Sequence, residues 1–440
     1  MSLPSVLLAR ALDRRGDLEG LFSRMDDGAQ AAFWLDAGPD AAEGWSILGV
    51  GRPETDAGRV SRTVIGGEHG AESPVPFHGG WVGWMSYEDG ARRMAAPAAD
   101  PETGSAWIVV DRAIAVDHST GRFWALAPAD DLDDWHRALA GLLSPAPPAA
   151  PARPPASVAV ARHGVDEYVA LVERCRDAIR AGDAYLLCLT TRFTTDAPPD
   201  PFAVYRRLRA ATPAHHGGYL RTGGTHLLSA SPEQFLEVRD GVVRTSPIKG
   251  TRPRGTTPEQ DAALAAELHA SEKERAENVM IVDLMRNDLS HVGVPGTIVV
   301  ERLWQVESYP AVHQLVSTVS ARLRDGVTVD DLGEAAFPAG SMTGAPKLSA
   351  MTILHELERA PRGVYSGCFG HIGLDGSADL GMVIRSVLVD GGTAYVGAGG
   401  GITWLSDAAE EAAEVATKAR APLAALGAEL PEEWLAAPRA

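Results

Sequence analysis

The chain has 440 residues, of which 45% are hydrophobic and 22% are charged, so it can bury a large core and form more than one lobe. Its formal net charge of −18 argues against nucleic acid as the main partner, because phosphate binding requires a basic surface. No apolar run approaches the roughly 20 residues that span a bilayer, which argues against a membrane protein. The three cysteines, Cys175, Cys188 and Cys368, are scattered and form no CxxC pair, which predicts free thiols and a cytoplasmic protein.

Residues 1–142 are predicted to form an N-terminal lobe. Residues 1–15 combine a short apolar run with arginines and lack a small-residue cleavage pattern, so we expect an amphipathic helix rather than a signal peptide. Residues 33–36 and 45–49 are predicted strands. The glycine- and aromatic-rich residues 79–88 predict a buried strand that crosses close to another backbone, with core packing favoured over a ligand site.

A proline- and alanine-rich linker is predicted at residues 143–158, where the composition favours an extended, semi-rigid spacer. It separates the N-terminal lobe from a second domain, residues 159–430, in sequence and not necessarily in space.

The second domain mixes helices with hairpins. Three Asp-Gly turns, at 240–241, 375–376 and 390–391, are flanked by β-prone runs and predict antiparallel hairpins. A buried strand is expected at 185–190. Apolar spacing predicts helices at residues 163–179, 202–211, 257–291, 332–335, 348–357 and 407–426. This pattern predicts an α+β fold, with large antiparallel sheets flanked by helices.

One lysine is held in an unusual setting. Lys249 lies between an apolar residue and a glycine, with prolines on either side of the group. A two-residue turn at 240–241 would pair Arg239 with Val242 and Glu233 with Ile248. Lys249 is the next residue, so an acid, Glu233, and a base, Lys249, would lie at the open end of one hairpin. The ideal register places the side chains of Glu233 and Lys249 on opposite faces, so they can meet only if a bulge or a strand exit at Pro247 breaks the register.

Two helices each carry a pair of glutamates three residues apart, Glu274 with Glu277 and Glu411 with Glu414. Residues at this spacing share a helix face, and four carboxylates from two helices would suit Mg²⁺, which prefers oxygen ligands. Lys418 follows one turn later. Solvated helix faces are the alternative interpretation.

Other residues left two interpretations open. The run Gly397–Gly401 offers backbone N–H groups to an anionic oxygen, or forms a flexible or tightly packed turn. Arg385, with apolar neighbours, needs an acidic partner or an anionic ligand, and structural pairing is the commoner answer. His313 is more often a core histidine than a catalytic one.

These pieces occur in one order in a known family. The chain resembles the chorismate-utilising enzymes over about residues 163–425, and more weakly over the first lobe. The motifs that carry the resemblance are Ser231-Pro232-Glu233, Pro247-Ile248-Lys249-Gly250-Thr251, residues 277–288, Val312-His313-Gln314-Leu315-Val316-Ser317, residues 337–347 and Gly399-Gly400-Gly401.

The resemblance implies the fold of the chorismate-binding enzymes and a Mg²⁺-dependent replacement of the hydroxyl at carbon 4 of chorismate by ammonia. Lys249 would attack carbon 2 to form a covalent intermediate, and Glu233 would be the general acid. The implied Mg²⁺ ligands are Glu274, Glu277, Glu411 and Glu414. The implied substrate-binding residues are His313, Ser341, Tyr365, Arg385, Gly399, Gly400, Gly401 and Lys418.

Two positions separate the relatives within this family. Anthranilate synthases carry a small residue where Lys249 stands, and isochorismate and salicylate synthases carry a water-activating lysine at the position of Leu186. The resemblance therefore favours amination at carbon 4, although Leu186 and Leu187 depart from the polar residues usual in aminating enzymes.

The chain has no glutaminase cysteine motif, so ammonia is expected from a separate glutamine amidotransferase subunit or from free ammonium. The alternatives are an anthranilate synthase component I-like activity and a catalytically silent regulator that binds chorismate or tryptophan. In the second case Ser46 would lie at the edge of a tryptophan pocket. Folate synthesis and specialised metabolism both remain open as users of the product.

Overall fold

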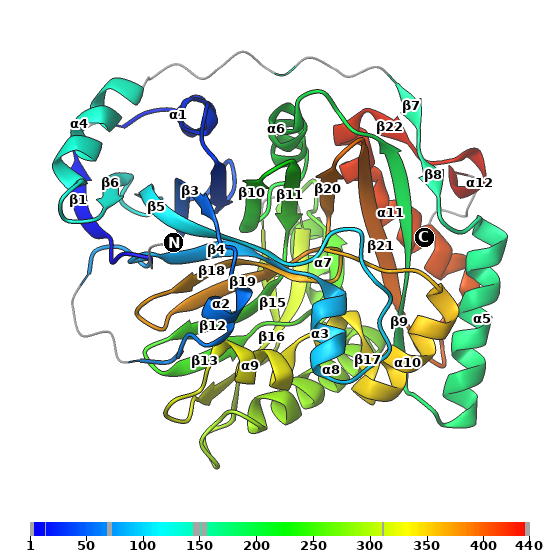
Figure 1. Ribbon diagram of the computed structural model, residues 1–440. Helices are drawn as coiled ribbons and strands as arrows, with labels where there is room; N and C mark the ends of the chain where they lie inside the picture. The colour runs from blue at the N-terminus through cyan, green and yellow to red at the C-terminus, as the bar shows by residue number, and fades with distance from the viewer. Residues whose placement is uncertain are drawn as a thin grey trace.

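The computed structural model describes residues 4–13, 15–67, 73–143, 151, 156–309 and 312–435. Within them, a 20-stranded sheet runs through the molecule, and helices pack around it (Figure 1). Its neighbouring strands pair antiparallel, as in β21 with β9 and β15 with β16. The predicted α+β fold, with a large antiparallel sheet flanked by helices, is confirmed.

The strands are β1 (Leu8–Leu12), β2 (Ala31–Asp36), β3 (Trp45–Pro53), β4 (Gly80–Met85), β5 (Ala106–Asp117), β6 (Arg122–Ala127), β7 (Ser157–Val158), β8 (Val160–Ala161), β9 (Leu186–Asp196), β10 (His216–Thr222), β11 (Thr225–Ser231), β12 (Gln234–Arg239), β13 (Val242–Thr245), β14 (Ile248–Pro253), β15 (Val299–Ser308), β16 (Val312–Arg322), β17 (Gly344–Ala345), β18 (Cys368–Gly373), β19 (Ala378–Met382), β20 (Ser386–Asp390), β21 (Thr393–Ile402) and β22 (Ala428–Glu429). The helices are α1 (Leu18–Asp26), α2 (Ala57–Ser61), α3 (Tyr87–Arg93), α4 (Leu132–Leu142), α5 (Val165–Ala181), α6 (Pro201–Ala211), α7 (Pro258–Ala270), α8 (Glu272–Ser290), α9 (Val329–Ala336), η1 (a 3-10 turn, Gly340–Met342), α10 (Lys347–Glu358), α11 (Ala408–Leu426) and α12 (Glu432–Leu435).

The expected N-terminal helix is wrong. Residues 8–12 form strand β1, which pairs with β6. The sheet offers this segment backbone partners, and that overrides its weak helical pattern. Strands β2, β3 and β4 are confirmed. Gly83 shows why β4 needs glycine, since a Cβ there would lie 2.2 Å from the backbone oxygen of Ala106.

The first lobe and the second half share the sheet. Strand β2 pairs with β10, and β4 pairs with β18, so segments far apart in sequence lie side by side (Figure 1). Most of the predicted linker, residues 144–150 and 152–155, lies outside the described residues, and Ser157–Val158 forms β7, which pairs with β22. The division into 1–142 and 159–430 stays a prediction.

The helices predicted for the second half are present, and local chemistry fixes their ends. The long helical stretch predicted at 257–291 is divided at Ser271, which ends α7 and caps α8 by accepting a hydrogen bond from the Glu274 amide. Asp407 caps α11, and Gly427 ends it in the left-handed region. The three cysteines are free and buried. Among the described helices, none is long and apolar enough to cross a membrane.

Candidate active site

The predicted hairpin forms, but its ladder is shorter than expected. Strands β12 and β13 pair from Arg239–Val242 to Glu237–Arg244, across a turn whose two central residues both have positive φ. On its other edge β12 pairs with β19, while β13 and then β14 pair along β16. The expected ladder pair of Glu233 with Ile248 is therefore wrong.

The register breaks two residues later than Pro247. Along β16 the pairing is continuous from Val242 to Ile248 and shifts between Ile248 and Thr251. The irregularity thus falls on Lys249 and Gly250, and Gly250 has a φ of +82°. A Cβ at Gly250 would lie 3.0 Å from the side chain of Glu274, so glycine both permits the bulge and lets α8 approach.

A buried polar cluster, which the sequence did not predict, holds the backbone just before the bulge. The Pro247 carbonyl accepts hydrogen bonds from the Asn278 side chain at 3.5 Å and the Ser317 amide at 3.3 Å. The Ser317 hydroxyl donates in turn to Asn278 at 2.5 Å. Because Asn278 follows Glu277 on α8, these bonds fix that helix against the lysine strand.

Glu233 is a buried carboxyl with polar partners. Interactions with the Ser341 side chain and the Ile248 backbone amide act to lower the pKa of its carboxyl. Burial raises the pKa of Glu233 to about 7, although the charge of Lys249 and these interactions oppose the shift. A carboxyl with this pKa can donate and recover a proton near neutral pH.

The amine of Lys249 lies above the glycine strand. Its Nζ is 3.3 Å from the position that a Cβ on Gly401 would occupy. Among the described residues, no carboxylate oxygen lies within the 4.0 Å of an ion pair with this amine. Burial alone would lower the pKa of Lys249, but the nearby Glu277, Cys188, Glu233 and Glu414 together raise it above its ordinary value.

Gly397 to Gly401 do not form a turn, so that alternative is wrong. They belong to β21, where Gly399 pairs with Thr190 and Gly401 pairs with Cys188 on β9. A Cβ at Gly397 would enter the Tyr365 ring, and one at Gly400 would lie 2.9 Å from Glu411 Oε2. Because successive residues of a strand face opposite sides, Gly397 and Gly401 share one face of β21 with the Tyr365 ring and the lysine, while Gly400 faces the other side, beside Glu411. We call the face of Gly397, Gly399 and Gly401 the glycine floor.

The two glutamate pairs interact as like charges. Burial raises the pKa of Glu277, and Glu274 and Glu414 add to the rise while Lys249 opposes it. Burial raises the pKa of Glu411 to about 7, and Glu414 again adds to the rise. Glu414 is itself held ionised by Lys418, 2.5 Å away, which lowers its pKa.

Four carboxylate side chains that repel one another fit a hard divalent cation as a donor set. Glu274 already lies 3.6 Å from Arg252, and Glu414 has half of its side chain exposed (49%). In the described parts of the chain, no three His, Cys, Asp or Glu side chains are arranged as a ready metal site.

The remaining predicted residues differ in placement. Lys418 donates to the Gly399 carbonyl at 2.9 Å. Arg385 is not within a strand: it joins β19 to β20 with a φ of +52°, donates to the Lys418 carbonyl at 3.3 Å, and burial lowers its pKa. His313 is held at both ring nitrogens, by Ser308 at 2.8 Å and Asp261 at 2.9 Å, as a core histidine would be.

An apolar wall faces the lysine. Leu186 and Leu187 are buried, and a Leu186 methyl lies 3.2 Å from the Cβ position of Gly401. Lys249 Nζ lies 3.3 Å from the same position, so Leu186 is the neighbour of the lysine over the floor, and it carries no base.

A second hollow lies away from this site, between the first lobe and strands β12, β18 and β19. It has a volume of about 980 Å³, and its walls include Trp45, Ile47 and His215. Ser46 is buried beside it, with its hydroxyl 2.8 Å from His118. The predicted tryptophan pocket would fall in this region.

The fold and the clustered motifs define a class of protein. The chain belongs to the chorismate-binding enzymes, whose family model, described as chorismate binding enzyme, matches residues 54–424. A solved anthranilate synthase component I from Streptococcus pneumoniae TIGR4 is 28% identical, has a TM-score of 0.74, and is matched over 95% of this chain and 92% of its own.

Particular relatives narrow the comparison. An aminodeoxychorismate synthase from Streptomyces griseus is 38% identical over 95% of this chain and 64% of its own length. One from Streptomyces pristinaespiralis is 44% identical over 80% of this chain and 51% of its own length. The chain therefore spans between half and two thirds of these relatives. Anthranilate synthase component 1 from Streptomyces coelicolor is also similar, at 42% identity over 80% of this chain and 73% of its own length.

Proposed function

We propose that this chain aminates chorismate at carbon 4, giving 4-amino-4-deoxychorismate and water. The observation that carries the proposal is the placement of Lys249, whose amine lies on the glycine floor without an ion-pair partner among the described residues. The buried Glu233, with a pKa of about 7, lies close enough for the two charges to affect each other. Similarity to two aminodeoxychorismate synthases supports the same reaction.

In the proposed mechanism Glu233 is the general acid and Lys249 is the nucleophile. Protonated Glu233 donates to the hydroxyl at carbon 4, which leaves as water while the neutral amine of Lys249 bonds to carbon 2. The bonded nitrogen then returns a proton to Glu233. Ammonia attacks carbon 4, the bond between Lys249 and carbon 2 breaks, and the proton that ammonia loses goes to the departing lysine nitrogen. One ammonia is consumed and one water is released.

The other predicted residues would bind the dianionic substrate. Glu274, Glu277, Glu411 and Glu414 would hold Mg²⁺, drawing closer around it than they stand in the structure. A bound Mg²⁺ would neutralise the carboxylates that raise the pKa of Lys249 and would hold the ring carboxylate. The chain's own contacts to substrate would come from the floor and its surroundings: Gly399, Gly400, Gly401, Lys418, Arg385, Tyr365, Ser341 and His313.

Ammonia would come from a separate glutamine amidotransferase subunit in the cytoplasm, or from free ammonium. All three cysteines are buried and free, so none is exposed as a nucleophile for glutamine. The buried Leu186 near Lys249 carries no base that could activate water, which favours ammonia as the second nucleophile.

An anthranilate synthase component I-like activity is the second candidate, because the Streptomyces coelicolor relative is 42% identical. A catalytically silent regulator is the third. Purified protein incubated with chorismate, Mg²⁺ and ammonium, with products separated by mass spectrometry, decides among them. Aminodeoxychorismate supports the proposal, anthranilate supports the second candidate, and unchanged chorismate supports the third.

A further inference from the structure

A buried arginine lies directly beneath the active site. The Arg362 side chain, 1% exposed, donates to the Met342 carbonyl at 2.6 Å and to the Cys188 carbonyl at 2.8 Å. Met342 belongs to η1 with Ser341, whose side chain acts to lower the pKa of Glu233, and Cys188 pairs with Gly401 in the floor. One guanidinium thus joins the support of the general acid to the support of the lysine.

The guanidinium is itself held from the opposite side. Glu358 accepts two hydrogen bonds from Arg362, at 2.9 and 2.8 Å. The same carboxylate also accepts from the amide and the hydroxyl of Thr190, both at 2.9 Å, and Thr190 pairs with Gly399. Every polar atom of the pair is therefore engaged, which makes its geometry rigid.

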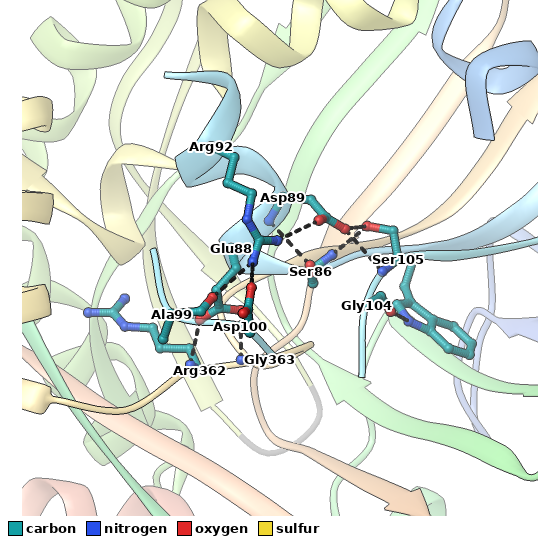
Figure 2. Close-up of polar contacts among 11 residues, drawn as sticks. Ser86, Glu88, Asp89, Arg92, Ala99, Asp100, Gly104, Ser105, Arg362 and Gly363 are labelled. Carbon is teal, nitrogen blue, oxygen red and sulfur yellow. Dashed lines mark hydrogen bonds and ion pairs between the residues drawn. The ribbon is translucent and has the colours of Figure 1, made fainter. Parts of the chain in front are cut away.

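The first lobe reaches the same arginine through α3. Glu88 accepts hydrogen bonds from the Arg362 amide at 2.6 Å and from the Gly363 amide at 3.0 Å (Figure 2). The Tyr87 ring lies under the guanidinium, 4.4 Å from its centre. A Cβ at Gly363, whose φ is +69°, would lie 2.6 Å from the Tyr395 hydroxyl, so this backbone has little freedom to shift.

We propose that Arg362 is a positioning residue for the general acid, and that Glu88 of the first lobe sets the backbone from which it acts. Arg362 does not touch the substrate. It holds η1 at a fixed height over the glycine floor, so that the Ser341 hydroxyl meets Glu233 while Lys249 lies over Gly401. The inference deepens the proposed amination and rests on it for its kinetic test.

Arg362→Lys tests this role while keeping a positive charge beside Glu358. We expect kcat to fall by about 10- to 100-fold with KM for chorismate within about threefold, because misplacement of a catalytic group by about 1 Å has this cost. The pH at which kcat falls should also rise, because losing the Ser341 interaction favours protonated Glu233. Amide exchange measured by mass spectrometry should quicken in residues 337–347.

Arg209→Lys is the matched control. Arg209 is a similarly enclosed arginine, 13% exposed, paired with Asp36 at 2.5 Å, and belongs to no part of the proposed site. The Arg209→Lys variant should lose about as much thermal stability as Arg362→Lys and keep the kcat of the wild type. Equal losses of kcat in the two variants would overturn the positioning role.

Two further measurements separate the possible failures. If the wild-type protein makes no aminated product, the proposed function fails, and the exchange experiment alone decides the inference: unchanged exchange at 337–347 in Arg362→Lys overturns it. If Arg362→Lys does not fold, Glu88→Gln takes its place, since it leaves the guanidinium and Glu358 intact. A smaller loss of kcat in the same direction supports the proposal, and an unchanged kcat overturns it.

Discussion

Two lysines in this chain follow similar sequences, but only one of them has an ion-pair partner among the described residues. Lys249 follows Pro247-Ile248, and Lys347 follows Ala345-Pro346. Lys347 is buried, with an ion pair to Asp288 at 2.6 Å and a hydrogen bond to the Ala336 carbonyl at 3.3 Å. Lys249 is surrounded by carboxylates and, among the described residues, is paired with none of them.

The difference supports the role proposed for Lys249, because a structural lysine and a reactive one need different surroundings. A buried charge is tolerated when one partner neutralises it at short range, as Asp288 does for Lys347. A lysine that must lose its proton and form a bond cannot be held in that way. The amine of Lys249 instead lies over the glycine floor, 3.3 Å from the position that a Cβ on Gly401 would occupy.

The largest expected effect comes from removing the amine of Lys249. Lys249→Ala should lower amination by at least about a thousandfold, because loss of a nucleophile removes an interaction that only the reaction uses. The melting temperature should stay close to that of the wild type, since no ion pair is broken. Lys249→Arg, which keeps the charge without a usable nucleophile, should be equally inactive. Undiminished turnover in either variant would remove Lys249 from the mechanism.

The opposite result is expected for the other lysine. Lys347→Met should lower the free energy of unfolding by about 3–5 kcal/mol, because it leaves Asp288 buried and unpaired. Denaturant titration measures the loss. The double variant Lys347→Met with Asp288→Leu removes both charges and should recover most of the stability. A single variant as stable as the wild type would show that the pair is unimportant for folding.

Glu233 sharpens the comparison, because in the proposed mechanism it donates the proton to the hydroxyl that leaves carbon 4. Glu233→Gln should lower kcat by about 100- to 1,000-fold. In the wild type the acid form of Glu233 predominates below its pKa of about 7, so kcat should fall as the pH rises through 7. The measurement needs a constant concentration of unprotonated ammonia, which otherwise increases with pH. A profile that stays flat across pH 7 would assign the proton to another group.

Much of the fold was predictable from local patterns. The Asp-Gly hairpins, the apolar spacing of α5 and the extent of α11 are encoded within a few neighbouring residues, and the structure confirms them. Strand β1 was missed because its strand state depends on pairing with β6, more than 100 residues away in the sequence. A single sequence carries no signal for such a pairing.

For the candidate site, too, the features encoded in short segments could be predicted, and those that depend on distant residues could not. Short segments of the sequence, and the family resemblance that they carry, predicted the lysine, the acid and both glutamate pairs as site residues, and their roles stay predictions. The position of the register break was missed by two residues, because it depends on Gly250 and on the hydrogen bonds that Asn278 and Ser317 make to Pro247. The hydrogen bonds of Arg362 could not be predicted for a similar reason, because its partners come from α3, β9, η1 and α10.

A third lysine lies between the two extremes and should show the smallest effect. Lys418 has a partner, Glu414 at 2.5 Å, but its side chain is 28% exposed and it also donates to the Gly399 carbonyl at 2.9 Å. Like Lys347 it has a carboxylate partner, and like Lys249 it lies next to the glycines of β21. Lys418→Met should raise KM for chorismate about tenfold and leave kcat within about threefold, because a charged hydrogen bond that is equally strong in ground and transition states affects binding alone. Thr417→Val, one residue earlier and with its hydroxyl bonded within α11 at 2.9 Å to the Ala413 carbonyl, is the control and should leave KM unchanged. A large fall in kcat for Lys418→Met would mean that a paired lysine also takes part in the reaction, and the absence of an ion pair would then no longer distinguish Lys249.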